Sequence, residues 1–410
     1  MVLSLQKYLS SFIYTEEGKR SLTVVESVSI AGAIVPQFTN EFWTSRQRQA
    51  HSLHEVSYRA CFKPQLPRFF IERLTKENDV VYDPFSGRGT TALEAALLGR
   101  KIAANDVNPL SRILSRPRIS PPTIEEIEQR LDRIRYAETE RSDIPLSMFF
   151  HKKTLREILS LRKYLMSRAV SGSEDHVDRW IRMVATNRLT GHSKGFFSVY
   201  TLPPNQALSP ASQKKINAVR KQKPEYRDTK TIILKKSRQL FRDLTESDRR
   251  RLRRCANTGK FITGDARLTR SLKSGSVQLT VTSPPFLDIV QYAHDNWLRC
   301  WFNGIDAGAV AQKITMSRTI DQWSAVMAAV FQELFRVTKK GGRIVFEVGE
   351  VRKGKIKLEE YVVQLGVNAG FRCEAIMINR QNFTKTANIW GVSNNTKGTN
   401  SNRIMIFIKQ

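Results

Sequence analysis

The stretch DVVYDPFSGRGTTALEAALLGRKIAANDVNPL, residues 79–110, decides the fold class. Residues 80–82 are a short run of β-favouring side chains, and the glycines of SGRG break the chain soon after it. Residues 90–98 are helix formers with apolar side chains on one face, and residues 101–106 read as a second short strand. Strand, turn, helix and strand in this order predict the opening of a doubly wound α/β sheet.

The turn itself, DPFSGRGTT at residues 83–91, lets a ligand approach the backbone at the start of a helix. It is not a Walker loop, and Ala92 stands where a dinucleotide fingerprint needs its third glycine. Asp106 ends the next strand about 20 residues further on, where a carboxylate can hold both ribose hydroxyls. The two features predict an adenosine-type ligand whose binding does not depend on phosphates.

A second motif, SPPF at residues 283–286, follows the β-rich run of residues 276–282 and therefore lies at the carboxyl edge of the sheet. Two prolines fix the backbone and remove amide donors, so the motif presents acceptors: the Ser283 hydroxyl oxygen and the Pro284 carbonyl. Acceptors beside the Phe286 ring suit the exocyclic amino group of a flat base. Taken alone, the motif would be better explained as a Pro-Pro turn that closes a strand.

The charge balance points to an acidic partner. Lys and Arg number 67 against 38 Asp and Glu, a formal net charge of +29, while 40% hydrophobic residues suffice for ordinary cores. Basic side chains that neutralise phosphates release counterions, so DNA or RNA is the predicted partner. A solvated basic surface is the alternative.

Residues 121–260 are helical and charge-rich and read as an insertion that splits the α/β domain. We therefore divide the chain into an N-terminal segment (1–45), a cofactor-binding half (46–120), the insertion (121–260) and a catalytic half (261–410). The second half of the insertion is the candidate nucleic-acid-binding face. The residues predicted to bind nucleic acid are Lys214, Lys215, Arg220, Lys221, Lys223, Arg249, Arg250 and Arg251.

Other classes are disfavoured. Residues 1–14 lack a secretory pattern, and the most apolar uncharged stretch, residues 27–40, falls short of the roughly 18–20 residues of a membrane helix. The four cysteines are far apart without a C-x-x-C pair, and the histidines lack metal-ligand spacing. We expect a cytoplasmic protein with reduced thiols, no membrane segment and no metal.

Together the motifs resemble the S-adenosylmethionine-dependent amino-methyltransferases of DNA, whose hallmarks are a D-P-F-x-G-x-G-T-T turn and a later S/N/D-P-P-Y/F element. The motif order agrees, because residues 62–67 look like the element that precedes the glycine turn and Gly264-Asp265 precedes SPPF. The resemblance covers about residues 50–112 and 260–410. It implies a Rossmann-like fold of the seven-stranded methyltransferase type, with the basic insertion as target-recognition region.

The resemblance also implies the cofactor site. Asp83, Phe85 and the two turn glycines would surround the methionine part of S-adenosyl-L-methionine, and Thr90 would cap the following helix. Asp106 would hold the ribose, and Asp265 would lie near the adenine amino group. The predicted cofactor-binding residues are Phe62, Lys63, Asp83, Pro84, Phe85, Ser86, Gly87, Gly89, Thr90, Thr91, Asp106, Val107, Asp265 and Ala266.

Ser283, Pro284, Pro285 and Phe286 are the predicted catalytic residues. Hydrogen bonds from the amine to Ser283 and to the Pro284 carbonyl would aim its lone pair at the methyl group, and Phe286 would stack on a base rotated out of the duplex. A serine in the first position looks most like the cytosine-N4 enzymes, whereas Asn or Asp is commoner in adenine-N6 enzymes. Because Phe286 replaces the more frequent Tyr, adenine stays open.

The sequence thus predicts a methyltransferase of double-stranded DNA in a bacterial restriction-modification system, nucleoid-associated and with a cognate restriction endonuclease as partner. An RNA amino-methyltransferase and a non-catalytic DNA-binding protein on the same scaffold are the alternatives. Residues 288–297 line the base pocket or form a packed helix. Glu347 and Glu350, at the end of a strand, are expected to be structural rather than catalytic.

Overall fold

The computed structural model describes residues 4–16, 19–30, 32–43, 50–59, 61–136, 141–202, 207–285, 295–314, 317, 319–349, 357–380 and 401–410. Phe286, one of the predicted catalytic residues, lies outside these ranges, as does Glu350. The same is true of residues 288–294, the first part of the segment after SPPF.

A nine-stranded sheet forms the centre of the molecule, in the order β3-β4-β10-β11-β9-β8-β5-β6-β7. The strands are β3 (Val24–Ile30), β4 (Ala33–Asn40), β5 (Val80–Asp83), β6 (Lys101–Asp106), β7 (Lys260–Thr263), β8 (Val277–Thr282), β9 (Thr338–Gly349), β10 (Arg372–Arg380) and β11 (Ser401–Ile408). Strands β9, β8, β5, β6 and β7 run parallel, whereas β11 is antiparallel to both of its neighbours. The seven strands from β10 to β7 are the doubly wound sheet that the sequence predicts, so the fold class is confirmed.

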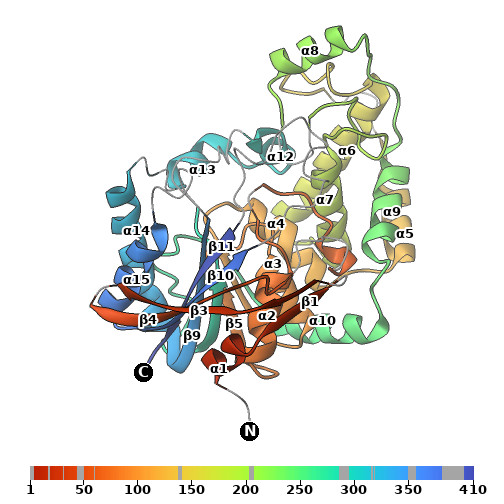
Figure 1. The fold of residues 1–410 in the computed structure, drawn as a ribbon. Helices are drawn as coiled ribbons and strands as arrows, with labels where there is room; N and C mark the ends of the chain where they lie inside the picture. The colour runs from red at the N-terminus through yellow and green to blue at the C-terminus, as the bar shows by residue number, and fades with distance from the viewer. Residues whose placement is uncertain are drawn as a thin grey trace.

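The N-terminal segment contributes strands that the sequence analysis did not foresee. β4 pairs in parallel with β10, and β3 lies at the edge of the sheet beyond β4. β1 (Ile13–Glu16) and β2 (Lys19–Leu22) form a separate hairpin next to them (Figure 1). Most of β3 is exposed, and only Val28 and Ile30 are half-buried against the core, so the alternating apolar pattern is too short to mark this strand.

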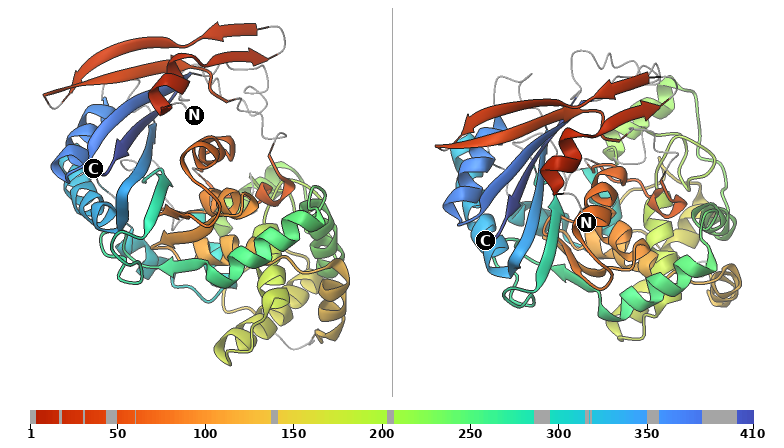
Figure 2. Two further views of the ribbon diagram at one scale, coloured as in Figure 1. Left: turned by 90° about the horizontal axis from the view of Figure 1, so that it is seen from below. Right: turned by 60° about the horizontal axis from the view of Figure 1, so that its bottom comes forward.

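Helices cover the sheet on both faces (Figure 2). The helices of the α/β domain are α1 (Leu5–Ser10), η2 (Ser52–His54), α2 (Gln65–Leu74), α3 (Thr90–Leu97), α4 (Leu110–Ser115), η3 (Arg116–Ile119), α12 (Trp297–Phe302), α13 (Ala307–Lys313), α14 (Ile320–Val337) and α15 (Leu358–Asn368). One buried cluster joins α2 and α3 to one face, and a second joins α14 and α15 to the other. This two-sided burial explains why the inner strands read as continuous apolar runs.

The insertion consists of α5 (Ile124–Arg133), α6 (Lys152–Val170), α7 (His176–Arg188), α8 (Pro210–Val219), α9 (Thr229–Leu240) and α10 (Glu246–Thr258). Its core is continuous with that of the sheet, because Trp180 of α7 and Leu252 of α10 belong to the cluster that contains α2 and α3. The indole of the fully buried Trp180 donates to Ser237 Oγ of α9 at 2.9 Å. α8 forms the far tip of the insertion and α10 lies at its base (Figure 1).

In the described parts of the chain, no helix has the length and apolar character needed to cross a bilayer.

Candidate active site

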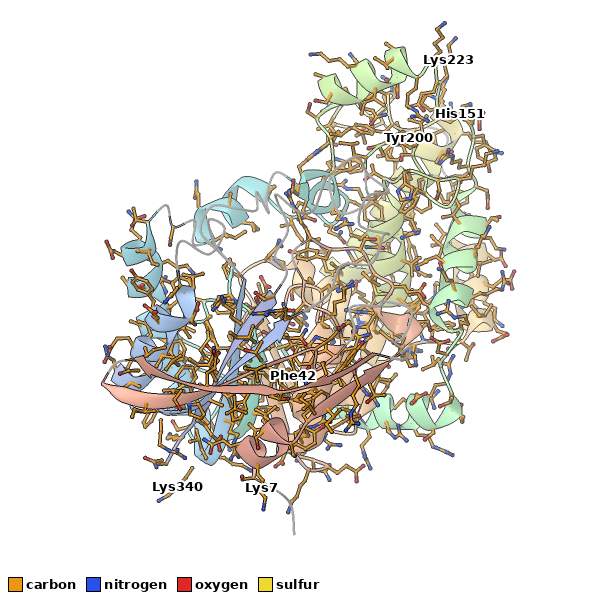
Figure 3. The ribbon with its side chains drawn as sticks, in the orientation of Figure 1. Lys7, Phe42, His151, Tyr200, Lys223 and Lys340 are labelled. Carbon is orange, nitrogen blue, oxygen red and sulfur yellow. The ribbon has the colours of Figure 1, made fainter. Side chains whose placement is uncertain are left out.

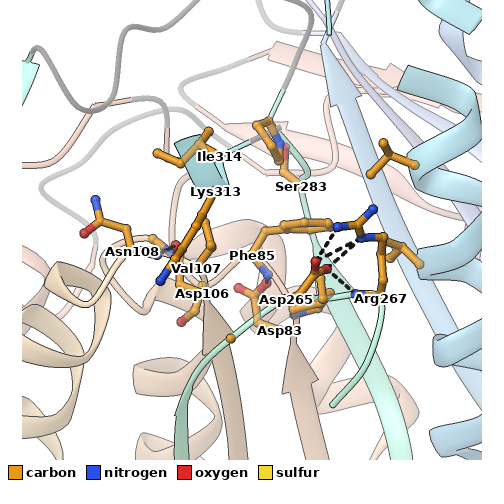
Figure 4. Close-up of a pocket in the computed structure, with 18 of the residues that line it drawn as sticks. Asp83, Phe85, Asp106, Val107, Asn108, Asp265, Arg267, Ser283, Lys313 and Ile314 are labelled. Carbon is orange, nitrogen blue, oxygen red and sulfur yellow. Dashed lines mark hydrogen bonds and ion pairs between the residues drawn. The ribbon is translucent and has the colours of Figure 1, made fainter. Parts of the chain in front are cut away.

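A pocket opens at the carboxyl ends of β5, β6, β7 and β8, where open α/β sheets bind their ligands (Figure 4). Thirteen of the predicted site residues line it: Phe62, Asp83, Pro84, Phe85, Ser86, Gly87, Thr90, Asp106, Val107, Asp265, Ala266, Ser283 and Pro285. Ser283 and Pro285 of the SPPF motif therefore line the same cavity as the glycine turn, although the two motifs begin 200 positions apart in the sequence.

Asp83 ends β5 and is buried beneath the pocket. Its Oδ1 accepts hydrogen bonds from Thr282 Oγ1 at 2.7 Å and from the Phe85 amide at 3.1 Å. Burial nevertheless raises the pKa of Asp83 to about 7. The bond from Thr282 ties the end of β5 to the residue that precedes Ser283.

Asp106 ends β6 and fixes the glycine turn from the other side. Its Oδ2 accepts from the Gly87 amide at 2.8 Å and its Oδ1 from the Asn108 amide at 2.9 Å. Burial raises the pKa of Asp106 to about 6. Each carboxylate oxygen keeps a further lone pair, so the side chain can still accept from ribose hydroxyls in the pocket.

Gly89 is the N-cap of α3 and adopts a left-handed conformation with φ +76°. A Cβ there would lie 2.4 Å from the Ser115 Cβ, so only glycine fits this turn. The expectation that Thr90 caps the helix is wrong, since Gly89 occupies that position and α3 begins at Thr90 itself. Thr90 instead lines the pocket.

Asp265 follows β7 and forms a two-pronged ion pair with Arg267, with Nε–Oδ1 at 3.0 Å and Nη2–Oδ2 at 2.6 Å (Figure 4). The hydrogen bonds from Arg267 lower the pKa of Asp265. Both side chains are about half exposed, at 49% and 50%. The carboxylate predicted near the adenine amino group is thus held by an arginine that also lines the pocket.

Ser283 follows β8, half-buried at the pocket wall. The Pro285 carbonyl accepts from Trp323 Nε1 of α14 at 3.1 Å, which anchors the Pro-Pro segment. Pro284 is buried and does not line the pocket. The buried Glu347 of β9 accepts a hydrogen bond from Asn402 Nδ2 at 2.8 Å, and burial raises its pKa.

Three of the predicted cofactor-binding residues, Lys63, Gly89 and Thr91, do not line the pocket. Gly89 is packed against Ser115, and the Thr91 hydroxyl donates to the Val281 carbonyl at 3.1 Å, which docks α3 on β8. Lys63 lies before α2, where burial and the nearby Arg88 lower its pKa. Gly89 and Thr91 thus support the turn and its helix, and none of the three residues is part of the pocket lining.

The sequence analysis missed other pocket residues. Asn108 follows Asp106 by two positions and could have been found from its place after the strand. No motif marks the side chains that α13 and α14 contribute, because only the folded chain brings those helices over the pocket. The missed lining residues are Tyr58, Cys61, Asn108, Gly264, Arg267, Lys313, Ile314, Val326, Met327 and Val330.

The predicted nucleic-acid-binding residues form two separate groups. The tip group, defined as Lys214, Lys215, Arg220, Lys221 and Lys223, lies on and just after α8, whereas Arg249, Arg250 and Arg251 lie on α10 at the base (Figures 1 and 3). The tip group is exposed, with the Arg220 guanidinium 3.8 Å from the centre of the Tyr200 ring. Arg249 Nη1 instead donates to the carbonyls of Pro121 and Pro122, both at 3.2 Å, and Arg251 Nη1 to that of Leu97.

Among the residues that the structure describes, no three His, Cys, Asp or Glu side chains are placed to hold a metal ion.

Comparison with known proteins agrees with this geometry. Residues 32–115, which contain β4, the glycine turn and Asp106, match the family model of DNA methylase. Type II methyltransferase M.MvaI of Kocuria varians is 30% identical over 97 residues, which are 23% of this chain and 21% of that protein. Type II methyltransferase M.MjaII of Methanocaldococcus jannaschii is 27% identical over 86 residues, 21% of this chain and 16% of that protein. The chain thus spans a minor part of the curated relatives' length, and over the matched segment the resemblance to DNA amino-methyltransferases is confirmed.

Solved structures give weaker likenesses. TrmN from Thermus thermophilus is 12% identical with a TM-score of 0.34, over 88% of this chain and 52% of that one. An S-adenosylmethionine-dependent methyltransferase from Methanosarcina mazei is 10% identical with a TM-score of 0.31, over 83% and 96% of the two chains. The strand order, rather than these likenesses, carries the fold assignment.

The prediction of S-adenosylmethionine as the cofactor is confirmed by the family match, and the pocket fits this molecule. Ser86 and Asn108 line the pocket, and Ser86 Oγ and Asn108 Nδ2 are buried with no hydrogen-bond partner among the described residues. Buried polar atoms of this kind are normally satisfied, so a polar ligand is their expected partner. Gly87, which also lines the pocket, has a positive φ of +50° that side chains rarely adopt, so the turn keeps this backbone conformation with glycine.

Proposed function

We propose that the protein is a DNA methyltransferase that transfers a methyl group from S-adenosylmethionine to the exocyclic N4 amine of cytosine in double-stranded DNA. The observation that carries this proposal is the shared pocket of Ser283 and Asp83. These residues represent the amine-accepting motif and the cofactor turn, and the Thr282–Asp83 hydrogen bond joins the two strand ends at 2.7 Å. A methyl donor and an amine could therefore meet without a rearrangement of the sheet.

S-adenosylmethionine supplies an electrophilic methyl group on a positively charged sulfur. Asp83 and Asp106 place carboxylates under this part of the pocket, and Phe85 adds an aromatic wall. Pre-oriented charges of this kind cost no reorganisation during the reaction. Ser283, at the pocket wall, accepts a hydrogen bond from the target amine and so directs its lone pair. The predicted second acceptor, the Pro284 carbonyl, belongs to a buried residue outside the pocket lining, so we give it no part in this step.

Cytosine is preferred over adenine because the SPPF motif opens with serine, the residue that the resemblance associates with the cytosine-N4 enzymes. Phe286 then acts as the stacking partner of the flipped base. Methylation of adenine at N6 uses the same groups and the same attack, so it is the second candidate.

The tip group on α8 is the proposed DNA contact. Its exposed lysines and arginine can neutralise phosphates, and the site of α8 at the end of the insertion lets it reach along a duplex that enters the pocket. Arg249 and Arg251 donate to backbone carbonyls and thereby hold α10 in place, so we assign them a structural role.

A label-transfer assay tests the proposal. Purified protein is incubated with methyl-labelled S-adenosylmethionine and either unmethylated duplex DNA or total RNA, and the digested nucleosides are identified by mass spectrometry. Label on N4-methyldeoxycytidine is expected. Label on N6-methyldeoxyadenosine would move the base assignment to adenine, and label in RNA alone would move the substrate class to RNA. Bound cofactor without any label would favour the non-catalytic scaffold.

The proposed setting is a restriction-modification system in a bacterial cytoplasm, with a cognate restriction endonuclease. DNA from cells that express the protein should then resist one sequence-specific nuclease. Resistance that requires Ser283 would link the protection to this pocket.

A further inference from the structure

The C-terminal end of α7 carries a buried arginine, Arg188, whose residue is only 9% exposed. Its guanidinium donates from Nε to the Asn187 carbonyl at 3.1 Å and from Nη2 to Asn187 Oδ1 at 3.0 Å. The Phe196 ring packs on it, with the guanidinium carbon 4.0 Å from the ring centre. Among the described residues, none accepts a hydrogen bond from Nη1 and no carboxylate forms an ion pair with this side chain.

Two further buried cations lie beside Arg188, namely Lys236 of α9 and Arg299 of α12. Burial, together with the charge of Arg299, lowers the pKa of Arg188 to about 10. Glu55 opposes this shift, but its carboxylate already binds Lys236 Nζ at 3.6 Å and Arg242 Nη2 at 2.9 Å. The cluster therefore carries more positive than negative charge.

A buried charge without a counter-ion is costly, because the protein interior solvates it less well than water does. Arg182, six residues earlier on α7, shows the usual solution. This arginine is also buried, and it donates from Nε to Glu174 Oε1 at 2.7 Å and from Nη2 to the Leu165 carbonyl at 2.6 Å. Arg188 has no such acid among the described residues, so its surroundings favour an anion from outside the protein.

The end of α7 lies beside the pocket. Asn187 holds both backbone groups of Ser57, since its Oδ1 accepts from the Ser57 amide at 3.2 Å and its Nδ2 donates to the Ser57 carbonyl at 2.9 Å. Tyr58, the next residue, lines the pocket. Thr186 Oγ1 accepts from Asn303 Nδ2 at 2.9 Å, which docks α7 on the end of α12. The unpaired guanidinium is thus placed where the insertion meets the pocket wall.

We propose that Arg188 binds a backbone phosphate of the DNA strand whose base enters the pocket. The inference rests on the proposed function and names the part of the substrate that is held at this place. A guanidinium suits a phosphate, because its N–H groups form a planar fork that can meet two phosphate oxygens. A base that rotates out of the duplex brings its own phosphates toward the pocket, so a cation in the adjoining wall can hold them.

DNA binding across a salt series tests this site, with a duplex that contains the sequence methylated by the wild type. Arg188→Met should weaken binding roughly 10- to 100-fold and lower the salt slope by about 0.9, the contribution of one phosphate. The affinity for S-adenosylmethionine should stay within about twofold. Arg182→Met, on the same helix, is the matched control and should keep the slope. An unchanged slope for Arg188→Met, in a protein that methylates DNA, would overturn the inference and leave the proposed function standing.

Single methylphosphonate linkages, each of which removes one phosphate charge, test the contact from the DNA side. One linkage next to the methylated base should weaken binding to the wild type about as much as Arg188→Met does. The same linkage should cost Arg188→Met nothing further, because the partner of that phosphate is already gone. Equal losses for the two proteins at every linkage would contradict the contact. A wild-type protein that methylates no nucleic acid would overturn both this inference and the proposed function.

Urea unfolding without DNA distinguishes a ligand-binding arginine from a structural one. Arg188→Met removes an unpaired buried charge, so its urea midpoint should equal or exceed that of the wild type. Arg182→Met leaves Glu174 without its partner and should lower the midpoint. Equal decreases for the two variants would show that Arg188 is structural. Arg188→Lys, which keeps the charge without the planar fork, is the second variant if Arg188→Met does not fold, and it should weaken DNA binding while it keeps the salt slope.

Discussion

Asp83 and Asp106 are carboxylates whose burial favours the protonated form. With its pKa raised from 3.8 to about 7, Asp83 binds a proton more strongly in the folded than in the unfolded chain. Between these two values the native state holds more protons, so the free energy of unfolding falls as the pH rises. Asp106, with a pKa near 6, adds to the same trend. A positively charged cofactor bound beside them would stabilise the ionised carboxylates and so offset the effect of burial on their pKa values.

We therefore expect Asp83→Asn to flatten the loss of stability between pH 5 and pH 8 and to be more stable than the wild type at the higher pH by up to a few kcal/mol. Urea unfolding at the two pH values measures this difference. The variant should also bind S-adenosylmethionine more weakly. Asp321→Asn, at an exposed carboxylate, is the control. If this variant reduced the pH dependence of stability as much as Asp83→Asn does, the assignment of that dependence to Asp83 would be wrong.

Gly89 and Gly172 make a matched pair because both have strongly positive φ, +76° and +70°. A Cβ at Gly89 would meet Ser115 at 2.4 Å, whereas nothing lies within 4 Å of one at Gly172. Gly172→Ala should cost about 1 kcal/mol of backbone strain, and Gly89→Ala should cost about 1–3 kcal/mol more from crowding. Denaturant midpoints measure both, and equal losses would show that the turn can relax.

At the scale of elements, the sequence predicts what local patterns encode. β5, α3 and β6 follow from residues 79–110, since a strand, a positive-φ turn and a helix each have a local signature. β3 has only a short one, because just Val28 and Ile30 of this edge strand pack against the core while its other residues are exposed. The placement of α13 over the pocket depends on long-range packing, so no spacing in the sequence reveals it.

The two basic groups of the insertion should behave differently. Lys214→Glu with Lys215→Glu, on α8, should weaken DNA binding and reduce the salt slope by roughly 0.9 for each phosphate that the variant no longer neutralises. Arg250→Glu with Arg253→Glu, exposed on α10, is the matched control of equal charge change and should keep most of the slope. Binding measured across a salt series decides between them, and a flatter slope for the α10 pair would extend the DNA face to the base of the insertion.

Across the whole molecule, the pocket draws on chain from both sides of the insertion, and one apolar cluster contains residues of all four parts of the chain. Cofactor at 100 times its Kd should therefore raise the free energy of unfolding by about 2.7 kcal/mol in a single transition. Tryptophan fluorescence, which includes Trp180 of the insertion, and circular dichroism should shift together. Asp106→Ala should abolish the shift, and a separate early transition of the insertion would contradict this shared core.

The position of β11 in the sheet determines when the sheet can form during synthesis. This strand, residues 401–408, lies between β9 and β10, so β10, β4 and β3 reach the rest of the sheet only through it. A nascent chain on the ribosome can build the cofactor turn early, but the sheet stays split until β11 has emerged. Asn402, which donates to Glu347 of β9, arrives on that same strand. The two parts of the sheet are therefore joined only after residues 401–408 have been made.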